Sequence, residues 1–283
     1  MKKVIRFPLV WMLVGAFIML LSSSVFRRLT DGPEGFMSIV LALVGGGVSI
    51  GIYWLLMKFM AGRKVPELHV KRAGTETIFG ATIGLVLIAV SVGIIVLFGG
   101  YSFQWSADRF AMSVIASAIG AAILEELVFR GIMLQAIEKM GGSWIALAVT
   151  SIFFGGAHLV NEGATIWSAI AIFIEAGILL GAGFLWRRNI WFVVGLHFAW
   201  NALEGLLGIP VSGVASKGLF EVTLSGSTLL TGGSFGLEAS VVPIIVSLMI
   251  AIPMMIAASR RGNLQNKRNK GTKQIQKNRD IAG

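Results

Sequence analysis

The sequence contains no cysteine. A disulfide framework, a thiolate metal site and a cysteine nucleophile are therefore all excluded. Charge is scarce too: 13% of the residues are charged, whereas soluble globular proteins average about 25%. Hydrophobic residues make up 55% of the chain, and they recur in runs long enough to cross a bilayer. These proportions predict a polytopic membrane protein.

The hydrophobic residues are grouped into separate apolar stretches. The 36 glycines fit a membrane protein, because small residues let helices pack closely in lipid. We therefore expect an all-α fold, a polytopic transmembrane helix bundle with about eight spans. The predicted helices cover residues 8–25, 36–60, 78–99, 110–136, 144–159, 166–186, 190–207 and 241–258.

The distribution of lysine and arginine predicts the orientation of the bundle. With the N-terminus inside, eighteen basic residues fall in inner segments and four in outer segments. Inner loops of membrane proteins carry an excess of these residues. The pattern therefore predicts an N-in, C-in topology with an even number of spans. A cleaved signal peptide is the competing interpretation of the first stretch, but cleavage would leave seven helices and place the basic tail on the wrong side.

The same pattern divides the chain into parts. We expect three N-terminal membrane helices, a core of four helices, an outer loop, a last membrane helix and a basic cytoplasmic tail. Their predicted bounds are residues 1–107, 108–207, 208–239, 240–259 and 260–283.

The net charge of +10 lies mainly in the inner segments and the tail. Residues 263–283 are polar and basic and lack aromatic side chains, so we expect disorder there and contact with anionic lipid headgroups. A solvated tail explains this charge better than nucleic acid, and we expect no nucleic-acid partner. The outer loop is rich in Gly, Ser and Thr, and is interpreted either as a flap over an outer opening or as a linker.

The fourth stretch contains two adjacent carboxylates and one arginine. Glu126 and Arg130 are four residues apart, so they share a helix face and can form an ion pair. Glu125 points about 100° away and has Phe129 at its own i+4 position. Ionisable groups within a membrane are costly and commonly functional. An ion-pair cluster that only fastens helices is an equally weighted alternative.

Two of the three histidines lie on later apolar stretches. His158 ends the fifth stretch, and His197 lies within the seventh, one turn before Asn201. A single histidine inside a membrane is usually a hydrogen-bonded packing residue. Two of them on separate helices, close in sequence to the Glu pair, favour a site. His69 lies in a basic inner loop and is expected to be exposed.

These side chains suffice for hydrolysis of a peptide bond. A carboxylate can take a proton from water and pass it to the leaving amine, while a histidine holds the water. A His–Asn pair can donate hydrogen bonds to the tetrahedral oxyanion. Alternatively, Glu125, His158 and His197 can bind Zn²⁺ with an open position for water. The H-E-x-x-H motif is absent, so a standard zincin arrangement is excluded.

Three motifs, taken together, resemble the CAAX-protease and bacteriocin-processing (CPBP, or Abi) family of intramembrane metalloproteases. They are E-E-x-x-x-R, F-x-x-x-H and H-x-x-x-N. In this chain they run from Glu125 to Arg130, from Phe154 to His158 and from His197 to Asn201. The resemblance covers residues 114–206, and the R-R-N-I-W stretch at 187–191 also resembles the family's arginine-containing turn.

The resemblance implies a helical membrane fold with a water-filled catalytic chamber. By this correspondence Glu125 is the general base and His158 positions the water. His197 and Asn201 stabilise the oxyanion, while Glu126 and Arg130 support the site. A zinc enzyme and a metal-free glutamate mechanism are equally compatible with these residues. The family also implies a peptide or protein-tail substrate, either CAAX-like or a leader or bacteriocin peptide.

Two further carboxylates lie in apolar stretches. Glu175 is in the sixth stretch, where only apolar and small residues are expected, and Glu204 follows Asn201 by three residues. A hydrogen bond to a neighbouring helix is the favoured explanation for each. A role in the wall of the chamber is the alternative.

The leading hypothesis is an endopeptidase in a bacterial cytoplasmic membrane. A non-catalytic scaffold or immunity protein is the first alternative. A proton-coupled transporter is the second, although no inverted repeat or matched pair of broken helices supports it.

Overall fold

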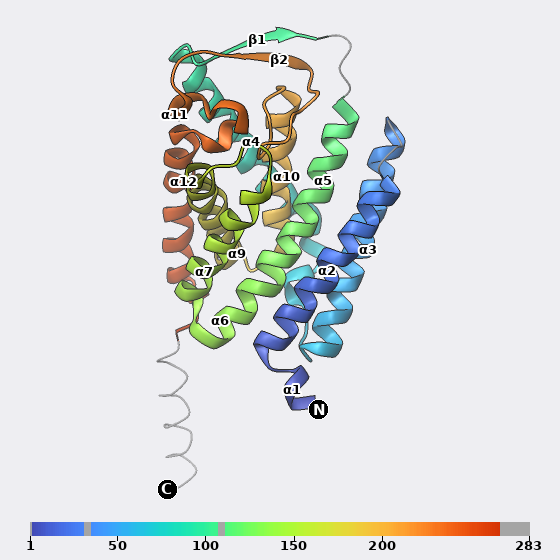
Figure 1. Ribbon diagram of the computed structural model, residues 1–283. Helices are drawn as coiled ribbons and strands as arrows, with labels where there is room; N and C mark the ends of the chain where they lie inside the picture. Colours follow the sequence, from blue (N-terminus) through green and yellow to red (C-terminus); the bar gives the residue numbers. More distant parts are fainter. Residues whose placement is uncertain (1, 31–34, 107–110, 267–283) are drawn as a thin grey trace, which may run out of the picture.

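The computed structural model describes residues 2–30, 35–106 and 111–266. These residues form a bundle of long helices with a two-stranded sheet across one end (Figure 1). The helices are α1 (Lys2–Ile5), α2 (Pro8–Thr30), α3 (Phe36–Leu55), α4 (Ala73–Leu97), α5 (Ala111–Glu126), α6 (Gln135–Gly141), α7 (Ser143–Ala157), α8 (Ile166–Ile172), α9 (Leu179–Arg187), α10 (Ile190–Leu206), α11 (Thr228–Thr231) and α12 (Val241–Arg260). The strands are β1 (Tyr101–Trp105) and β2 (Phe220–Leu224).

Short segments of other helical types join or continue these helices. Three are π-helical: η1 (Leu56–Met60), η4 (Leu127–Leu134) and η6 (Phe173–Ile178). Five are 3₁₀ turns: η2 (Pro66–Leu68), η3 (Val70–Arg72), η5 (His158–Val160), η7 (Gly233–Phe235) and η8 (Leu237–Ala239). The segment η4 joins α5 to α6, so these three form one continuous apolar helical rod. The segment η6 joins α8 to α9 in the same way, and these three form a second rod.

The predicted helical membrane bundle is confirmed. All eight predicted stretches are helical where the structure describes them, and six segments are long and apolar enough to cross a membrane. The helices over Pro8–Ser24 and Ile190–Leu206 are apolar but shorter. Helix α1 and the end of α12 lie at the same end of the bundle (Figure 1). The number of spans and the N-in orientation stay predictions. The expected disorder of residues 263–283 is wrong for the first four of them, since Asn263 donates to the Trp186 carbonyl and Gln265 donates to Glu138. The rest of the tail, from residue 267 onward, and the predicted helix start at residue 110 lie outside the described residues.

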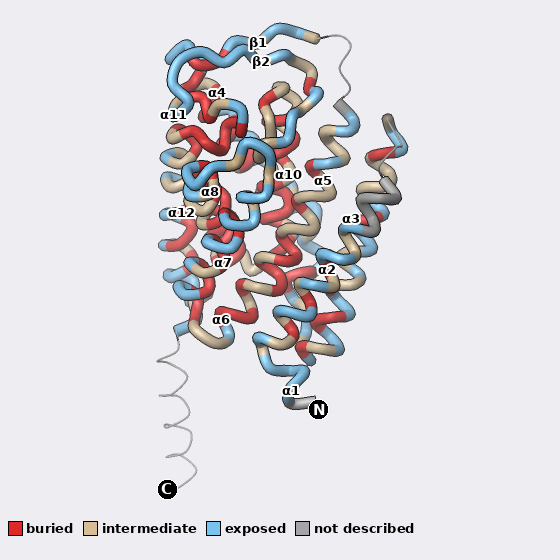
Figure 2. The backbone as a smooth tube through the Cα atoms, in the orientation of Figure 1, coloured by how far each residue is buried: buried red, intermediate tan, exposed pale blue. Residues whose placement is uncertain are grey.

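Burial separates the central helices from the outer ones. Most residues of α10 are buried, and so is most of the rod formed by α8, η6 and α9 (Figure 2). The outer helices expose large apolar side chains, among them Phe17 on α2 and Ile152 on α7. An apolar surface of this kind suits contact with lipid. The short α10 is therefore surrounded mainly by protein.

The outer loop is an ordered cap. Within residues 208–239 the chain forms β2, α11, η7 and η8, and β2 pairs antiparallel with β1, from Tyr101 opposite Leu224 to Trp105 opposite Phe220. The Trp167 indole donates to the Ala239 carbonyl at 2.7 Å, which fastens the cap to α8. The alternative of a plain linker is therefore wrong, and neither strand is predicted from the sequence.

Helices α4 and α10 approach closely because glycines line their crossing. A Cβ at Gly84 would lie 2.4 Å from the Leu196 carbonyl oxygen, and one at Gly195 would lie 2.1 Å from the Thr77 carbonyl oxygen. Both distances are shorter than real contacts, so only glycine permits this approach. Since Leu196 precedes His197, the crossing fixes the depth and rotation of that histidine.

Ion pairs close the opposite end of the bundle. The turn between α9 and α10 carries Arg187, which forms a bidentate ion pair with Glu76 at the start of α4. Arg187 Nε donates to Glu76 Oε2 at 2.9 Å, and Arg187 Nη2 donates to Oε1 at 2.5 Å. Its neighbour Arg188 pairs with Glu138 on α6, with both contacts at 2.6 Å. Arginine suits such pairs because its planar fork matches a carboxylate. The arginine turn between α9 and α10 is therefore tied to both α4 and α6. In the loop before α4, His69 is exposed, as predicted.

Replacing Gly84 by alanine should destabilise the protein, because the new Cβ forces α4 and α10 apart. We expect a loss of about 1–3 kcal/mol, measured as a lower unfolding temperature in detergent. A Cβ added at Gly93 on the same helix would meet no other heavy atom within 4 Å, so Gly93→Ala is the matched control. Equal unfolding temperatures for the two variants would show that the crossing tolerates a methyl group.

Candidate active site

A buried carboxylate shared by two cationic groups forms the centre of the site. Glu126, the last residue of α5, is fully buried. Its Oε1 accepts a hydrogen bond from Arg130 Nη1 at 2.9 Å and lies 2.8 Å from His197 Nδ1. The predicted Glu126–Arg130 pair is therefore confirmed. The contact with His197 joins the first motif to the third.

The position of Arg130 depends on a π-helical turn. Arg130 lies within η4, which begins directly after Glu126, and π-helical turns are often found at functional sites. Its Nη2 donates to the carbonyl oxygens of Ala176 and Gly177 in η6, at 3.1 and 3.3 Å. The Arg130 guanidinium thus donates hydrogen bonds both to the Glu126 carboxylate and to backbone carbonyls of a second π-helical turn.

Glu125 differs from its neighbour in exposure and in partners. Its side chain is 29% exposed, whereas that of Glu126 is 0% exposed. Its Oε2 lies 3.9 Å from His197 Nε2, too far for a hydrogen bond, and this buried oxygen has no hydrogen-bond partner among the described residues. The ring of His197 thus lies between the two carboxylates. Glu125 stays available for another ligand.

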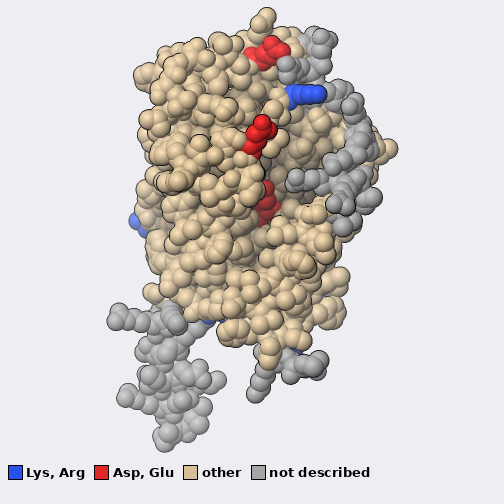
Figure 3. Space-filling view, viewed as in Figure 1, with Lys and Arg blue, Asp and Glu red and all other residues tan. Residues whose placement is uncertain are grey.

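Exposure makes Glu125 unusual among the acids of the chain. Of the acidic residues that the structure describes, only Glu125, Glu162 and Glu221 are not buried. The face seen in Figure 3 is hollowed between the helices, with an acidic side chain recessed in the hollow. A carboxylate that is partly exposed within an apolar bundle can meet water without leaving the protein interior.

His158 ends α7 and begins the 3₁₀ turn η5. Its Nδ1 lies 2.7 Å from the Phe154 carbonyl oxygen. Because a carbonyl oxygen only accepts, Nδ1 carries the hydrogen, and Nε2 of the neutral ring keeps a lone pair. The half-buried ring can therefore accept a hydrogen bond from water through Nε2.

Asn201 lies one turn after His197 on α10, as the spacing predicts, and both residues are buried. The N-terminus of this helix is held by Asn189, whose side-chain oxygen accepts from the backbone N–H of Trp191 at 2.9 Å. An asparagine in this position satisfies an N–H group that has no partner within the helix. The cap and the glycine crossing together place His197 and Asn201.

Phe154 is a further site residue, although its place in the F-x-x-x-H motif predicted no role for it. Its ring packs against His158, with centroids 4.9 Å apart, and against His197 at 6.2 Å. The Arg130 guanidinium lies over the same ring, 4.6 Å from its centroid. The F-x-x-x-H spacing could have indicated this, since residues four apart share a helix face.

The three predicted metal ligands, Glu125, His158 and His197, do not form a metal site in the structure. Among residues 2–30, 35–106 and 111–266, no three His, Asp or Glu side chains are arranged to hold a metal ion. The side chains of Glu125, His158 and His197 therefore do not fit a bound Zn²⁺ in this arrangement. The contacts of the two Nδ1 atoms do not bear on this, since histidines that bind a metal through Nε2 commonly hold Nδ1 in such hydrogen bonds.

Three other carboxylates are buried, one on α10, one in the cap and one in η6. Glu204 accepts from the Trp200 indole at 3.1 Å and from the Leu237 backbone N–H at 3.0 Å. Glu238, in η8, accepts from the Ser212 hydroxyl at 2.6 Å and interacts electrostatically with both site histidines. Burial raises the pKa of Glu238.

Glu175, the third of them, departs from the favoured explanation. It lies in η6, is 0% exposed, and neither of its carboxylate oxygens has a hydrogen-bond partner in the described part of the chain. The expected hydrogen bond to a neighbouring helix is therefore wrong for Glu175. For Glu204, hydrogen bonds exist, but they go to its own helix and to the cap rather than to a neighbouring membrane helix.

Comparison with known proteins agrees with these motifs. Residues 106–203 match a family model described as Type II CAAX prenyl endopeptidase Rce1-like. No curated protein and no solved structure matches the chain. The matched segment contains all three motifs, and its family model is the kind that the motifs predicted. Members of the family are membrane proteases, which supports a peptidase activity, and the six apolar helices agree with an integral membrane protein.

Removing Arg130 should destabilise the fold more than removing the whole ion pair. Arg130→Met leaves the Glu126 carboxylate short of one cation in a buried site, which costs roughly 3–5 kcal/mol. The double variant Glu126→Gln with Arg130→Met carries no such charge and should recover at least half of this loss. Unfolding temperatures in detergent measure both effects, and Arg72→Met, at an exposed arginine, is the control. A double variant less stable than Arg130→Met would contradict the assignment of Arg130 as the partner of a buried charge.

Proposed function

We propose that the chain is an intramembrane endopeptidase that hydrolyses peptide bonds with a water molecule activated by Glu125. One observation carries the proposal. Glu125 is a partly exposed carboxylate with a buried oxygen that lacks a hydrogen-bond partner among the described residues, and it faces a histidine whose other nitrogen is held by a second carboxylate. The match to a family of membrane proteases agrees with this chemistry.

Glu125 is the general base and then the general acid. Its carboxylate takes a proton from water as the water oxygen attacks the carbonyl carbon of the scissile peptide bond. A tetrahedral intermediate with a negative oxygen results. The protonated Glu125 then gives its proton to the leaving nitrogen, the carbon–nitrogen bond breaks, and a carboxylic acid and an amine are formed. A carboxylate in a water-poor site suits this work because little solvent competes for the proton.

His158 positions the attacking water. Its Nδ1–H donates to the Phe154 carbonyl, so its Nε2 accepts a hydrogen bond from the water. This contact leaves the second hydrogen of the water for Glu125. The stacking of the imidazole against the Phe154 ring limits its rotation.

His197 and Asn201 stabilise the oxyanion. The Glu126 carboxylate at Nδ1 holds the His197 ring so that Nε2 points toward Glu125, and it offsets positive charge on the ring when Nε2 donates. The side-chain amide of Asn201, one turn away, is the second donor. Donors fixed before the reaction are the most effective, since they need no reorganisation as charge develops.

The mechanism above needs no metal ion. If a metal ion were bound by Glu125, His158 and His197, it would polarise the carbonyl group and activate water. Holding it would require the Glu125 carboxylate and Nε2 of both rings to converge on one point. Among the described residues no three such side chains are arranged to hold a metal ion, which favours the glutamate mechanism.

The substrate that fits is a peptide or protein tail that lies at a membrane. The site is enclosed by apolar helices with lipid-facing outer surfaces, so an apolar or lipid-modified segment reaches it without crossing much water. We place the protein in a bacterial cytoplasmic membrane, with leader, bacteriocin or CAAX-like peptides as the substrate class. Anionic lipids attracted by the basic tail are expected partners.

Glu125→Gln should lower cleavage by at least about a thousandfold without lowering the unfolding temperature, because the amide cannot accept the proton of water. The assay is release of the C-terminal fragment from membrane-anchored peptides by the purified protein, followed by mass spectrometry. Glu162→Gln, at an exposed acid outside the three motifs, is the matched control and should keep full activity.

The same assay separates the alternatives. Turnover that survives Glu125→Gln would reject Glu125 as the base. No turnover by the unaltered protein, combined with a partner retained by Glu125→Gln, would favour a scaffold or immunity protein, and pH-driven flux in liposomes would favour a transporter. Activity that is lost with a chelator and restored by Zn²⁺ would contradict the metal-free mechanism.

A further inference from the structure

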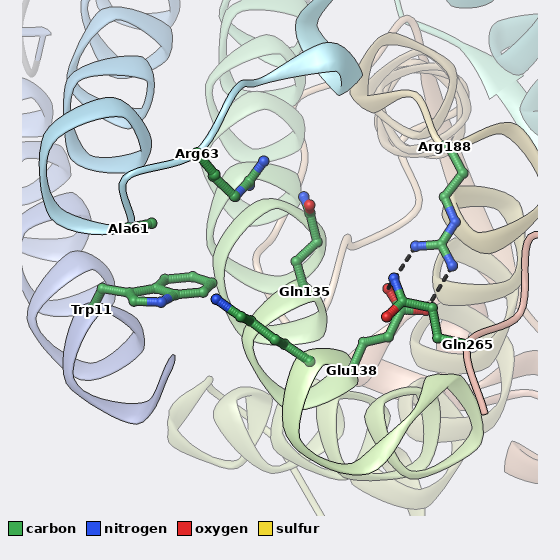
Figure 4. Close-up of a pocket in the computed structure, with 8 residues that line it drawn as sticks. Trp11, Ala61, Arg63, Gln135, Glu138, Arg188 and Gln265 are labelled. Atoms are coloured by element: carbon green, nitrogen blue, oxygen red, sulfur yellow. Dashed lines mark hydrogen bonds and ion pairs between the residues drawn. The ribbon is translucent and has the colours of Figure 1, made fainter. Parts of the chain in front are cut away.

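A polar pocket lies at the end of the bundle that contains α1, α6 and the end of α12. It has a volume of about 180 Å³ and is lined by residues of α2, α6, the loop after η1, the α9–α10 turn and the segment after α12 (Figure 4). In Figure 4, Trp11 stands on one side, and Arg188, Glu138 and Gln265 stand on the other. The pocket is separate from the candidate active site, since no residue of the three motifs lines it and Arg188 enters it from the arginine turn.

Two buried donors on the pocket wall have no acceptor. Trp11 is 2% exposed, and its indole Nε1–H lacks a hydrogen-bond partner in the described residues. The Nε–H of Arg63 is likewise buried and unpartnered, although its other nitrogens bind Glu67 and Tyr53. An unmade hydrogen bond of a buried donor costs about 1–3 kcal/mol. Two such donors on one wall therefore indicate a ligand with acceptor atoms.

The charges that line the pocket favour a negatively charged ligand. Among the described residues that line the pocket, Glu138 is the only acid, and the Arg188 guanidinium neutralises it through two contacts at 2.6 Å. Its oxygens are further occupied by the Ser143 hydroxyl and the Gln265 amide. The Lys139 ammonium, in contrast, makes no ion pair or hydrogen bond within residues 2–30, 35–106 and 111–266. One positive charge is thus left without a counterion in this part of the chain.

The depth of the pocket suits a group at the membrane surface. Trp11 lies near the start of α2, Arg63 follows the candidate span Phe36–Met60, and Lys139 lies near the end of the candidate span Met112–Gly141. The pocket is therefore level with the ends of apolar helices, where a bilayer has its headgroups. Basic pockets between membrane helices at this level are typical sites for anionic headgroups.

We propose that this pocket binds a phosphate group, which is carried by a lipid headgroup or is free in solution. The phosphate oxygens accept from the Trp11 indole and from Arg63 Nε, and the Lys139 ammonium balances the negative charge. The occupied pocket ties α2 to α6 and to the loop after η1. Helix α6 continues directly from η4, the π-helical turn that contains Arg130. The ligand would therefore stabilise the α6 end of the helical rod that α5, η4 and α6 form.

The test is a binding measurement on the full chain in a non-ionic detergent. The probes are short-chain phosphatidylglycerol, short-chain phosphatidylcholine and inorganic phosphate, each titrated calorimetrically. Phosphatidylglycerol or inorganic phosphate should bind saturably, and phosphatidylcholine should bind at least about tenfold more weakly than phosphatidylglycerol because its own cation opposes Lys139. Competition by inorganic phosphate assigns the pocket to the free ion. Binding of phosphatidylglycerol that inorganic phosphate does not displace assigns it to a lipid.

Two variants connect binding to the pocket. Lys139→Gln and Trp11→Phe should each raise the Kd of the bound probe about tenfold, since each removes one donor to a charged group. The controls are Lys71→Gln, at an exposed lysine, and Trp191→Phe, at an indole whose buried N–H is also unpartnered among the described residues but lies outside the pocket. Both controls should keep the original Kd.

The unfolding temperature of each ligand-free variant shows whether it folds. Lys139 is exposed, so Lys139→Gln decides the outcome if Trp11→Phe proves unstable. An unchanged Kd in Lys139→Gln, or no saturable binding of either phosphate probe to the unaltered protein, would overturn the proposal.

Discussion

The buried carboxylate of Glu126 is the constraint on which the site depends. A negative charge in the interior of a membrane protein must be compensated nearby, because water cannot solvate it. Arg130 and His197 supply that compensation at 2.9 and 2.8 Å. Arg130 also binds backbone carbonyls of η6, and its guanidinium lies over Phe154 of α7. One charge therefore brings four separate elements together, and Glu125 is left available beside them.

Local patterns in the sequence predicted the parts of the site that lie on one helix. The Glu126–Arg130 pair and the shared face of His197 and Asn201 both follow from residues four apart. The contact between Glu126 and His197 could not be predicted in this way, because it depends on how α10 is rotated against α5. That rotation is set by the close crossing of α4 and α10, where carbonyl oxygens occupy the space that a Cβ at Gly84 or Gly195 would need.

The features that could not be predicted are contacts between residues far apart in the sequence, and a buried carboxylate that has no hydrogen-bond partner among the described residues. Strands β1 and β2 are five residues each and pair across more than a hundred residues of chain, so neither carries a strong signal of its own. The role of Phe154 was missed because an aromatic residue in an apolar helix is ordinary. Glu175 was expected to find a partner, and its two oxygens prove unpartnered among the described residues only once the neighbouring helices are placed. In each case the three-dimensional packing, rather than helical periodicity, decides the contact.

The most direct test of the account is an experimental structure with a peptide phosphonamidate, a tetrahedral analogue of the hydrolytic intermediate, bound to the protein. The account predicts one phosphonyl oxygen within about 2.7–3.1 Å of His197 Nε2 and the other within hydrogen-bond distance of Glu125. It also predicts that His197 Nδ1 stays in contact with Glu126. An analogue bound away from Glu125, or a His197 ring turned so that Nδ1 leaves Glu126, would contradict it.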